Sequence, residues 1–197
     1  MVAEIPSLTL GVRNEPNTWS LGNIRARLCG MSIAASLIPE LDQEASVTRR
    51  VLERVPADKL EWQPHPKSMT LGQLALHVAG TPGAIAEIAA MNEVPMPDFG
   101  DQPRPESAEE LLPTLEESVA KAKAYLNGLT DEAAGADWSA VRDGQPVLTL
   151  PRIAFIRSIM LNHWYHHRGQ LTVYLRLLDV PVPAVYGASA DENPFEM

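Results

Sequence analysis

Residues 161–176 read LNHWYHHRGQLTVYLR and contain three of the five histidines of the chain. On a helical wheel of about 100° per residue, His163 and His167 fall on the same face as Met160 and Tyr174. Imidazoles on an inward-facing helix surface are costly unless their nitrogens find partners. The stretch therefore predicts a helix that carries two histidines with a specific task, and such a site needs partners from other segments.

Helical periodicity extends over four long segments, which are separated by loops rich in proline. Pro151 is suited to the first position of a helix, and the helix that contains the histidines is predicted to end near Leu178. The predicted helices span residues 31–55, 70–91, 107–128 and 151–178. Four amphipathic helices bury their apolar faces most simply in a bundle. We therefore predict an all-α fold, a four-helix bundle with long loops.

Capping signals set the expected ends of two of these helices. Thr70 with Gln73, and Ser107 with Glu110, have the spacing of a capping box, in which each side chain bonds the other residue's backbone N–H. Gly128 is a plausible helix stop, because glycine is common just beyond the last helical turn.

Two interruptions of the helical pattern are also expected. The sequence GTPG at residues 80–83 is predicted to kink or break its helix, because Pro82 removes a backbone donor and clashes with the preceding turn. A short β-hairpin is predicted near residues 138–149, with a turn at 142–145 and with Trp138 packed inward.

The composition divides the chain into three parts. Residues 1–30 are rich in Pro, Asn and Gly and show no sustained period, so we expect a loosely ordered N-terminal extension. Met31 opens the first helix and is a second candidate for the natural start of the protein. Residues 31–192 form the predicted helical domain, and residues 193–197 a C-terminal tail.

The net charge of −9 and the pI of about 5.0 argue against a nucleic-acid partner, because an acidic chain does not attract a phosphate backbone. No apolar run approaches the roughly 20 residues that span a bilayer, so we expect no membrane contact. Cys29 is the single cysteine, which excludes an intrachain disulfide framework. A cytoplasmic location is the simplest expectation.

A third histidine, His77, lies on the inward face of the segment 70–91, between Leu74 and Thr81. A shared metal ion would satisfy His163 and His167 together, since i, i+4 spacing places their rings side by side. Three neutral imidazoles from two helices, with one position left open, are typical of a catalytic metal site.

Other interpretations of the histidines stay open at this point. A single histidine on an apolar face is more often a core residue whose nitrogens are hydrogen-bonded than a metal ligand. His166 could replace His167 as the partner of His163, at i, i+3 spacing. His65 lies in a proline-rich loop and is predicted to be a surface residue.

Four stretches of the chain resemble the DinB/YfiT-like superfamily of metalloenzymes. The most specific of them is HWYHHRGQLTVYLR, which is similar to the superfamily's H-x-x-x-H-R-G-Q motif. The other three are LERVPADKLEW, LEWQPHPKSMTLGQLALHVAG and VPVPAVYGASADE. The resemblance covers about residues 31–192.

This resemblance implies a four-helix bundle with a long crossover and a metal bound by His77, His163 and His167. It also implies a homodimer. Characterised relatives are thiol-dependent S-transferases, which use bacillithiol or similar small thiols, and a mycothiol-dependent isomerase. We therefore expect a metal-dependent thiol S-transferase whose partners are a small thiol and an electrophilic small molecule. The cofactor would be a divalent ion, with Zn or Ni favoured and Fe, Cu or Mn compatible.

Two rival functions remain: a non-catalytic module that binds a metal or ligand in a stress response, and a metal-dependent hydrolase. A metal favours the thiolate form of a bound thiol, so Cys29 is not needed as a nucleophile. Gln170 is expected to orient a histidine ring. Arg168 is expected to point away from the apolar face, towards an acidic substrate, solvent or a second subunit.

Overall fold

The computed structural model describes residues 31–96, 100 and 102–195. The predicted N-terminal extension, residues 1–30, lies outside the described residues.

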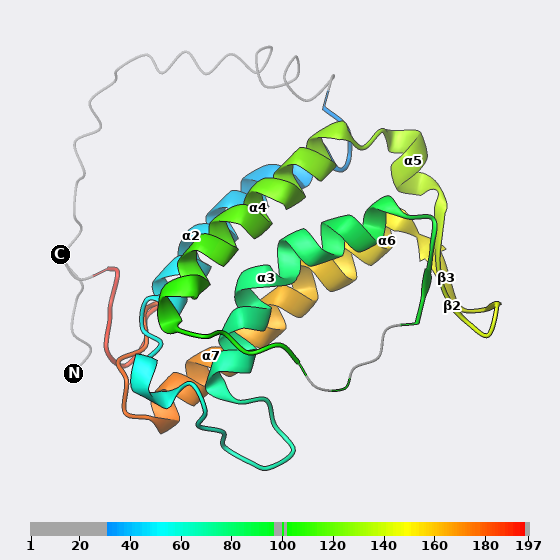
Figure 1. Ribbon diagram of the computed structural model, residues 1–197. Helices are drawn as coiled ribbons and strands as arrows, with labels where there is room; N and C mark the ends of the chain where they lie inside the picture. Colours follow the sequence, from blue (N-terminus) through cyan, green and yellow to red (C-terminus); the bar gives the residue numbers. More distant parts are fainter. Residues whose placement is uncertain (1–30, 97–99, 101, 196–197) are drawn as a thin grey trace, which may run out of the picture. The chain divides into compact units, whose positions relative to one another are not determined.

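Four long helical units form a bundle, which confirms the predicted fold class (Figure 1). α2 contacts α4, α4 contacts α3, and α3 contacts α7, so that each helix buries its apolar face against its neighbours. The long units are α2 (Ile38–Leu52), α3 (Leu71–Ala90), α4 (Leu111–Gly128), and a fourth made of α6 (Arg152–Phe155), η4 (Ile156–Asn162) and α7 (His163–Leu177). Shorter helical turns are η1 (Ala35–Leu37), η2 (Ala57–Lys59), η3 (Ala108–Glu110) and α5 (Asp131–Gly135).

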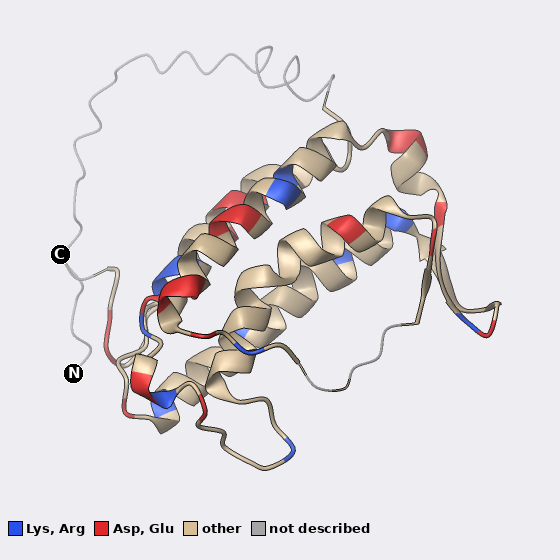
Figure 2. Cartoon of the chain, viewed as in Figure 1, with Lys and Arg blue, Asp and Glu red and all other residues tan. Residues whose placement is uncertain are grey.

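The core fills the space between the four helical units with aliphatic and aromatic side chains. The largest fully buried apolar side chains come from all four of them: Leu41, Leu71, Leu74, Leu111, Leu115, Leu126, Ile156, Met160, Leu161, Trp164 and Leu171. Charged residues of both signs lie along α2 and α4 (Figure 2). Ion pairs join these two helices, where Arg49 contacts Glu116 and Lys123 contacts Asp42.

The predicted β-hairpin is present and belongs to a three-stranded sheet. Strands β2 (Asp137–Arg142) and β3 (Gln145–Pro151) are antiparallel. Asp143 and Gly144 form the turn with φ angles of 51° and 72°, which suit a two-residue hairpin. β1 (Glu93–Pro95) pairs in parallel with β2 and lies between the helices predicted at 70–91 and 107–128, where only a loop rich in proline was expected.

The tryptophan at the base of the hairpin packs inward as predicted. Trp138 is buried and stacks on Phe155, with ring centroids 3.8 Å apart. Its indole N–H donates to the carbonyl of Ile88 at 3.2 Å. The sheet is therefore attached to both α3 and α6.

α3 continues through Pro82, so a break at GTPG is wrong. Proline leaves the carbonyl of Val78 without its helical donor, and Trp164 Nε1 of α7 donates to that carbonyl at 2.7 Å. The next N–H, that of Gly83, donates to Ser118 Oγ of α4 at 2.7 Å. The Trp164 indole thus replaces the bond that the helix cannot make at Pro82, and Ser118 adds a contact from α4 at the next residue.

Of the two predicted capping boxes, only the first forms. Thr70 accepts a bond from the Gln73 N–H and Gln73 accepts one from the Thr70 N–H. The predicted box of Ser107 and Glu110 is wrong, because the chain enters α4 through the 3₁₀ turn η3. In that turn the Ser107 carbonyl, rather than its side chain, accepts from the Glu110 N–H at 3.4 Å.

The bundle ends in a C-terminal segment, residues 179–195, that contains no helix or strand. Its composition predicts this irregular structure. Among the described helices, none combines the length and apolar character needed to cross a membrane.

Candidate metal centre

The imidazoles of His77, His163 and His167 converge inside the bundle. Each offers a ring nitrogen, and these nitrogens lie within 4.8 Å of one another. Nε2 of His77 lies 3.1 Å from Nε2 of His163. The three rings are nearly perpendicular in pairs, with interplanar angles of 80–84° and centroid separations of 4.3–5.3 Å. The sequence prediction that these three rings point at a common centre is therefore correct.

Two adjacent helices place these rings. His77 belongs to α3, one residue before Val78, whose carbonyl binds Trp164. Trp164 itself follows His163 on α7. The hydrogen bond between the Trp164 indole and the Val78 carbonyl therefore joins α3 and α7 directly beside His77 and His163.

A π-helical segment, η4, precedes His163 without a break in the helix. A π-helix holds more residues per turn than an α-helix, and such segments occur often at functional sites. The wheel that assumes about 100° per residue therefore applies to α7, but it does not apply to the residues before His163. No feature of the sequence analysis predicted this segment.

The three histidines are neutral at physiological pH. Burial, reinforced by the charge of His163, lowers the pKa of His77 to about 4. Burial, followed by the charges of His77 and His163, lowers the pKa of His167 to about 4. Burial also lowers the pKa of His163. Neutral imidazole is the form that binds a metal, so the rings are ready to act as ligands.

Gln170 contacts His167 as expected. Its Oε1 lies 2.7 Å from Nδ1 of His167, and an amide oxygen can only accept, so Nδ1 carries the proton. The lone pair of His167 is then on Nε2. This is the arrangement that outer hydrogen bonds give to metal-binding histidines.

The other two histidines lie outside the cluster. His166 is exposed, and its ring centroid lies 5.0 Å from that of His167. His65 is exposed in its loop, as predicted, and its Nδ1 accepts a bond from the Lys67 N–H.

The expectation for Arg168 is wrong. Its side chain is 1% exposed and pairs with Glu44 of α2 at 2.6 Å. The fully buried residues of α7 are centred about 100° from the histidines on the wheel, because α7 packs against α2 as well as α3. The histidines are half-buried at the edge of that face.

The cluster fits a divalent metal ion. Two ligands at Zn–N distances of about 2.0–2.1 Å in a tetrahedron have nitrogens about 3.3 Å apart, close to the 3.1 Å between His77 and His163. Three neutral nitrogen donors could hold one ion and leave a fourth position for water or a substrate atom.

Comparisons with known proteins agree with this fold. The chain is 26% identical over 151 residues to the uncharacterized protein YrdA of Bacillus subtilis strain 168, covering 76% of this chain and 85% of YrdA. A crystal structure of a DinB-like protein from Bacillus cereus ATCC 10987 matches with a TM-score of 0.58 and 25% identity, covering 76% of this chain and 95% of that one.

A second crystal structure, of the DinB-like protein YjoA from Bacillus subtilis, shares the fold with a TM-score of 0.56 and 20% identity. The match covers 73% of this chain and 92% of that one. The DinB family model matches residues 31–194. Since that match includes every helix of the bundle and all three clustered histidines, the chain belongs to the DinB family.

Proposed function

We propose that this protein binds one divalent metal ion through His77, His163 and His167 and uses it in a thiol-dependent S-transfer reaction. The observation that carries the proposal is the convergence of three imidazoles from two helices. Depressed pKa values support it, because rings that stay neutral need not lose a proton to become ligands.

In this reaction the protein's own residues would bind the metal ion and orient the rings that hold it. The three histidines supply neutral donors, and Gln170 holds the proton of His167 on Nδ1, which leaves the lone pair on Nε2. A bound divalent ion would favour the thiolate form of a small thiol, which is the nucleophilic form.

The donor set favours Zn or Ni and is compatible with Fe, Cu or Mn. Imidazole nitrogen suits all of these ions better than it suits Mg or Ca, which prefer oxygen. We therefore propose screening these five ions rather than a single one.

Metal analysis of His163→Ala tests the ligand assignment. Protein purified without chelators is expected to hold about one ion per chain, and His163→Ala is expected to hold almost none. His166→Ala is the matched control, because it removes an exposed histidine three residues away. Equal metal content in wild type and His163→Ala would refute the proposed ligands.

A turnover screen tests the reaction. Metal-loaded protein is incubated with bacillithiol, mycothiol or glutathione and an electrophile, and thiol consumption is measured above the uncatalysed rate. His163→Ala with the same metal in solution is the control. Stoichiometric metal without turnover of any thiol would instead support the non-catalytic binding module, and metal-dependent ester or amide cleavage would support the hydrolase.

A further inference from the structure

Arg168 follows His167 and is the most deeply buried charge among the described ion pairs. Its Nη2 lies 2.6 Å from Glu44 of α2, and its Nη1 donates to Thr48 Oγ1 at 3.2 Å. Nη2 also donates to the Tyr186 hydroxyl at 2.6 Å, and that hydroxyl donates to Glu44 at 2.9 Å. Arg168, Glu44 and Tyr186 thus form a closed triangle of bonds, here called the Arg168 triad.

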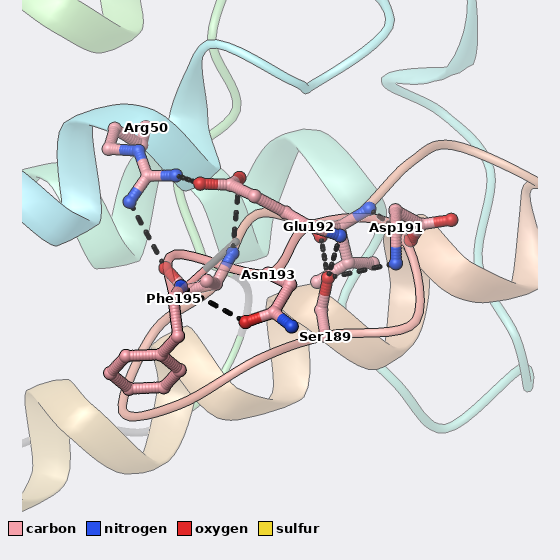
Figure 3. A network of polar contacts seen from close by, with 8 residues as sticks. Arg50, Ser189, Asp191, Glu192, Asn193 and Phe195 are labelled. Carbon is pink, nitrogen blue, oxygen red and sulfur yellow. Dashed lines mark hydrogen bonds and ion pairs between the residues drawn. The ribbon is translucent and has the colours of Figure 1, made fainter. Parts of the chain in front are cut away.

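Tyr186 reaches this triad from the C-terminal segment, which polar contacts attach to the bundle (Figure 3). Arg50 of α2 pairs with Glu192, and Arg176 of α7 pairs with Asp191. Ser189 Oγ accepts from the Asp191 and Glu192 N–H groups. The segment therefore contacts α2 and α7 at the same time.

We propose that the Arg168 triad positions the metal ligands of α7 by fixing the rotation of this helix about its axis. The proposal rests on the proposed metal site. α7 is held by Trp164, which bonds to α3, and one turn later by Arg168, which bonds to α2 and to Tyr186. Tyr186 is thus a positioning residue for His163 and His167.

The size of the effect follows from helix geometry. Side chains end about 5–6 Å from the axis, so a rotation of about 20° moves a ring nitrogen by about 2 Å. Metal–ligand distances tolerate only about 0.2 Å. A small change in helix rotation is therefore enough to weaken a metal site while the bundle stays folded.

Burial explains why this triad, rather than a surface pair, can fix the rotation. Arg168 and Glu44 are 1% and 6% exposed, and a buried pair cannot exchange its partners for water without a large cost. The guanidinium also lies 5.4 Å and 5.2 Å from the ring centroids of Tyr165 and Tyr186. These contacts with two tyrosine rings restrict the conformations available to the Arg168 side chain.

Tyr186→Phe is the first test. The substitution removes the hydroxyl of the triad and keeps the ring over Arg168. Because Tyr186 is 70% exposed, the loss of the hydroxyl leaves no buried space unfilled. Zn²⁺ affinity, measured by competition with a chromogenic chelator, is expected to fall about 3- to 10-fold, the range in which coupled networks modulate a distant site. Tyr125→Phe is the matched control, because its hydroxyl bonds the Ala89 carbonyl, away from the cluster. Both variants should lower Tm by about 2–4 °C, so that they differ in Zn²⁺ affinity and not in stability.

A second variant replaces the buried pair, Glu44→Met with Arg168→Met. Exchanging both charges for apolar side chains often leaves a protein folded, so affinity can be measured. A decrease in Zn²⁺ affinity of at least about tenfold is expected. The control is Arg49→Met with Glu116→Met, an exposed pair of the same 2.6 Å length between α2 and α4, which should bind Zn²⁺ like the wild type.

Nitrogen-15 NMR of the metal-free protein supplies an independent measurement. In Tyr186→Phe and in the Met pair the ring resonances of His163 and His167 should shift from their wild-type positions, because a rotation of α7 changes the separation of both rings from His77 of α3. Wild-type affinity and an unchanged His167 spectrum in both variants would overturn the positioning role. If the wild type itself binds no Zn²⁺, the metal proposal fails, and the NMR comparison still decides whether the triad positions the ring.

Discussion

The neutral state of His77, His163 and His167 is the residue-level property from which the proposed function follows. Burial and mutual repulsion favour the uncharged rings, and both effects act in the metal-free protein. The same two effects that make the rings ready for a metal also make the folded protein sensitive to acid.

We predict that the metal-free protein loses stability as the pH falls from about 6.5 to about 4. His77 and His167 have a folded pKa of about 4, below the ordinary histidine pKa of about 6.5 that the unfolded chain would show. The unfolded state therefore binds more protons in this window, and the free energy of unfolding rises with pH. The stabilisation that the two neutral rings contribute is fully present above about pH 6.5 and is lost as the pH falls towards 4.

Urea denaturation of metal-free protein between pH 4 and pH 7 measures this dependence. The double substitution His77→Gln with His167→Gln should flatten much of the profile in that window, because the two rings with a folded pKa of about 4 are removed. His65→Gln, on an exposed loop, is the control and should leave the profile unchanged. A profile as steep in the double variant as in the wild type would contradict the prediction.

At the scale of elements, α3 depends on its neighbours at Pro82 and Gly83. The bonds from Trp164 and Ser118 satisfy backbone groups that a straight helix would satisfy internally. This exchange joins α3 to α7 and α4 while keeping the helix continuous. Two predictions follow from these contacts.

We predict that Trp164→Phe destabilises the protein and that Pro82→Ala partly rescues it. Removing the indole N–H leaves the buried Val78 carbonyl unpaired, which costs about 1–3 kcal/mol in addition to the lost packing. Alanine at position 82 supplies the missing backbone N–H. A double-mutant cycle from chemical denaturation measures the coupling.

Trp138 offers a matched control for this cycle, since its indole bonds the Ile88 carbonyl, which lies away from Pro82. Pro82→Ala should leave the cost of Trp138→Phe unchanged. Equal coupling energies for the two tryptophans would show that the rescue is a general effect of alanine on helix stability.

Close contact between α3 and α4 leads to the second prediction, on Gly83→Ala. A Cβ at Gly83 would lie 2.8 Å from Ser118 Cα, so the helices must separate. Overpacking of this kind costs about 1–3 kcal/mol. At Gly80 the nearest atom, Thr114 Cγ2, is 3.9 Å away, so Gly80→Ala should be neutral or stabilising by up to about 1 kcal/mol. Thermal denaturation distinguishes the two, and equal Tm values would refute the predicted clash.

At the scale of the whole bundle, the proposed ion would connect α3 to α7 and so stabilise the fold as a unit. Ligands that bind only the folded state stabilise it by about 2.7 kcal/mol at 100 times Kd. For a domain of this size that corresponds to a rise in Tm of about 5–10 °C. Zn²⁺ titration with thermal denaturation should show this rise in the wild type and not in His163→Ala. An equal rise in both would place the stabilising ion elsewhere.

Periodicity and turn residues predicted the bundle and the hairpin and placed the three histidines on inward faces, and the resemblance to the DinB/YfiT-like superfamily joined these histidines in one site. Hydrophobic spacing and capping depend on neighbours within a few residues, so they are readable along the chain. The Thr70 cap and the Asp143–Gly144 turn are of this kind. His163 and His167 share a face because they are four residues apart.

Contacts between distant segments decided the rest. Glu44 and Arg168 are 124 positions apart, and the periodicity of α7 alone did not indicate that a second helix covers its other face. The strand β1 needs β2 to pair with, and the Val78 carbonyl needs Trp164. A buried polar group is stable only with its partner in place, and the folded chain is what brings that partner to it.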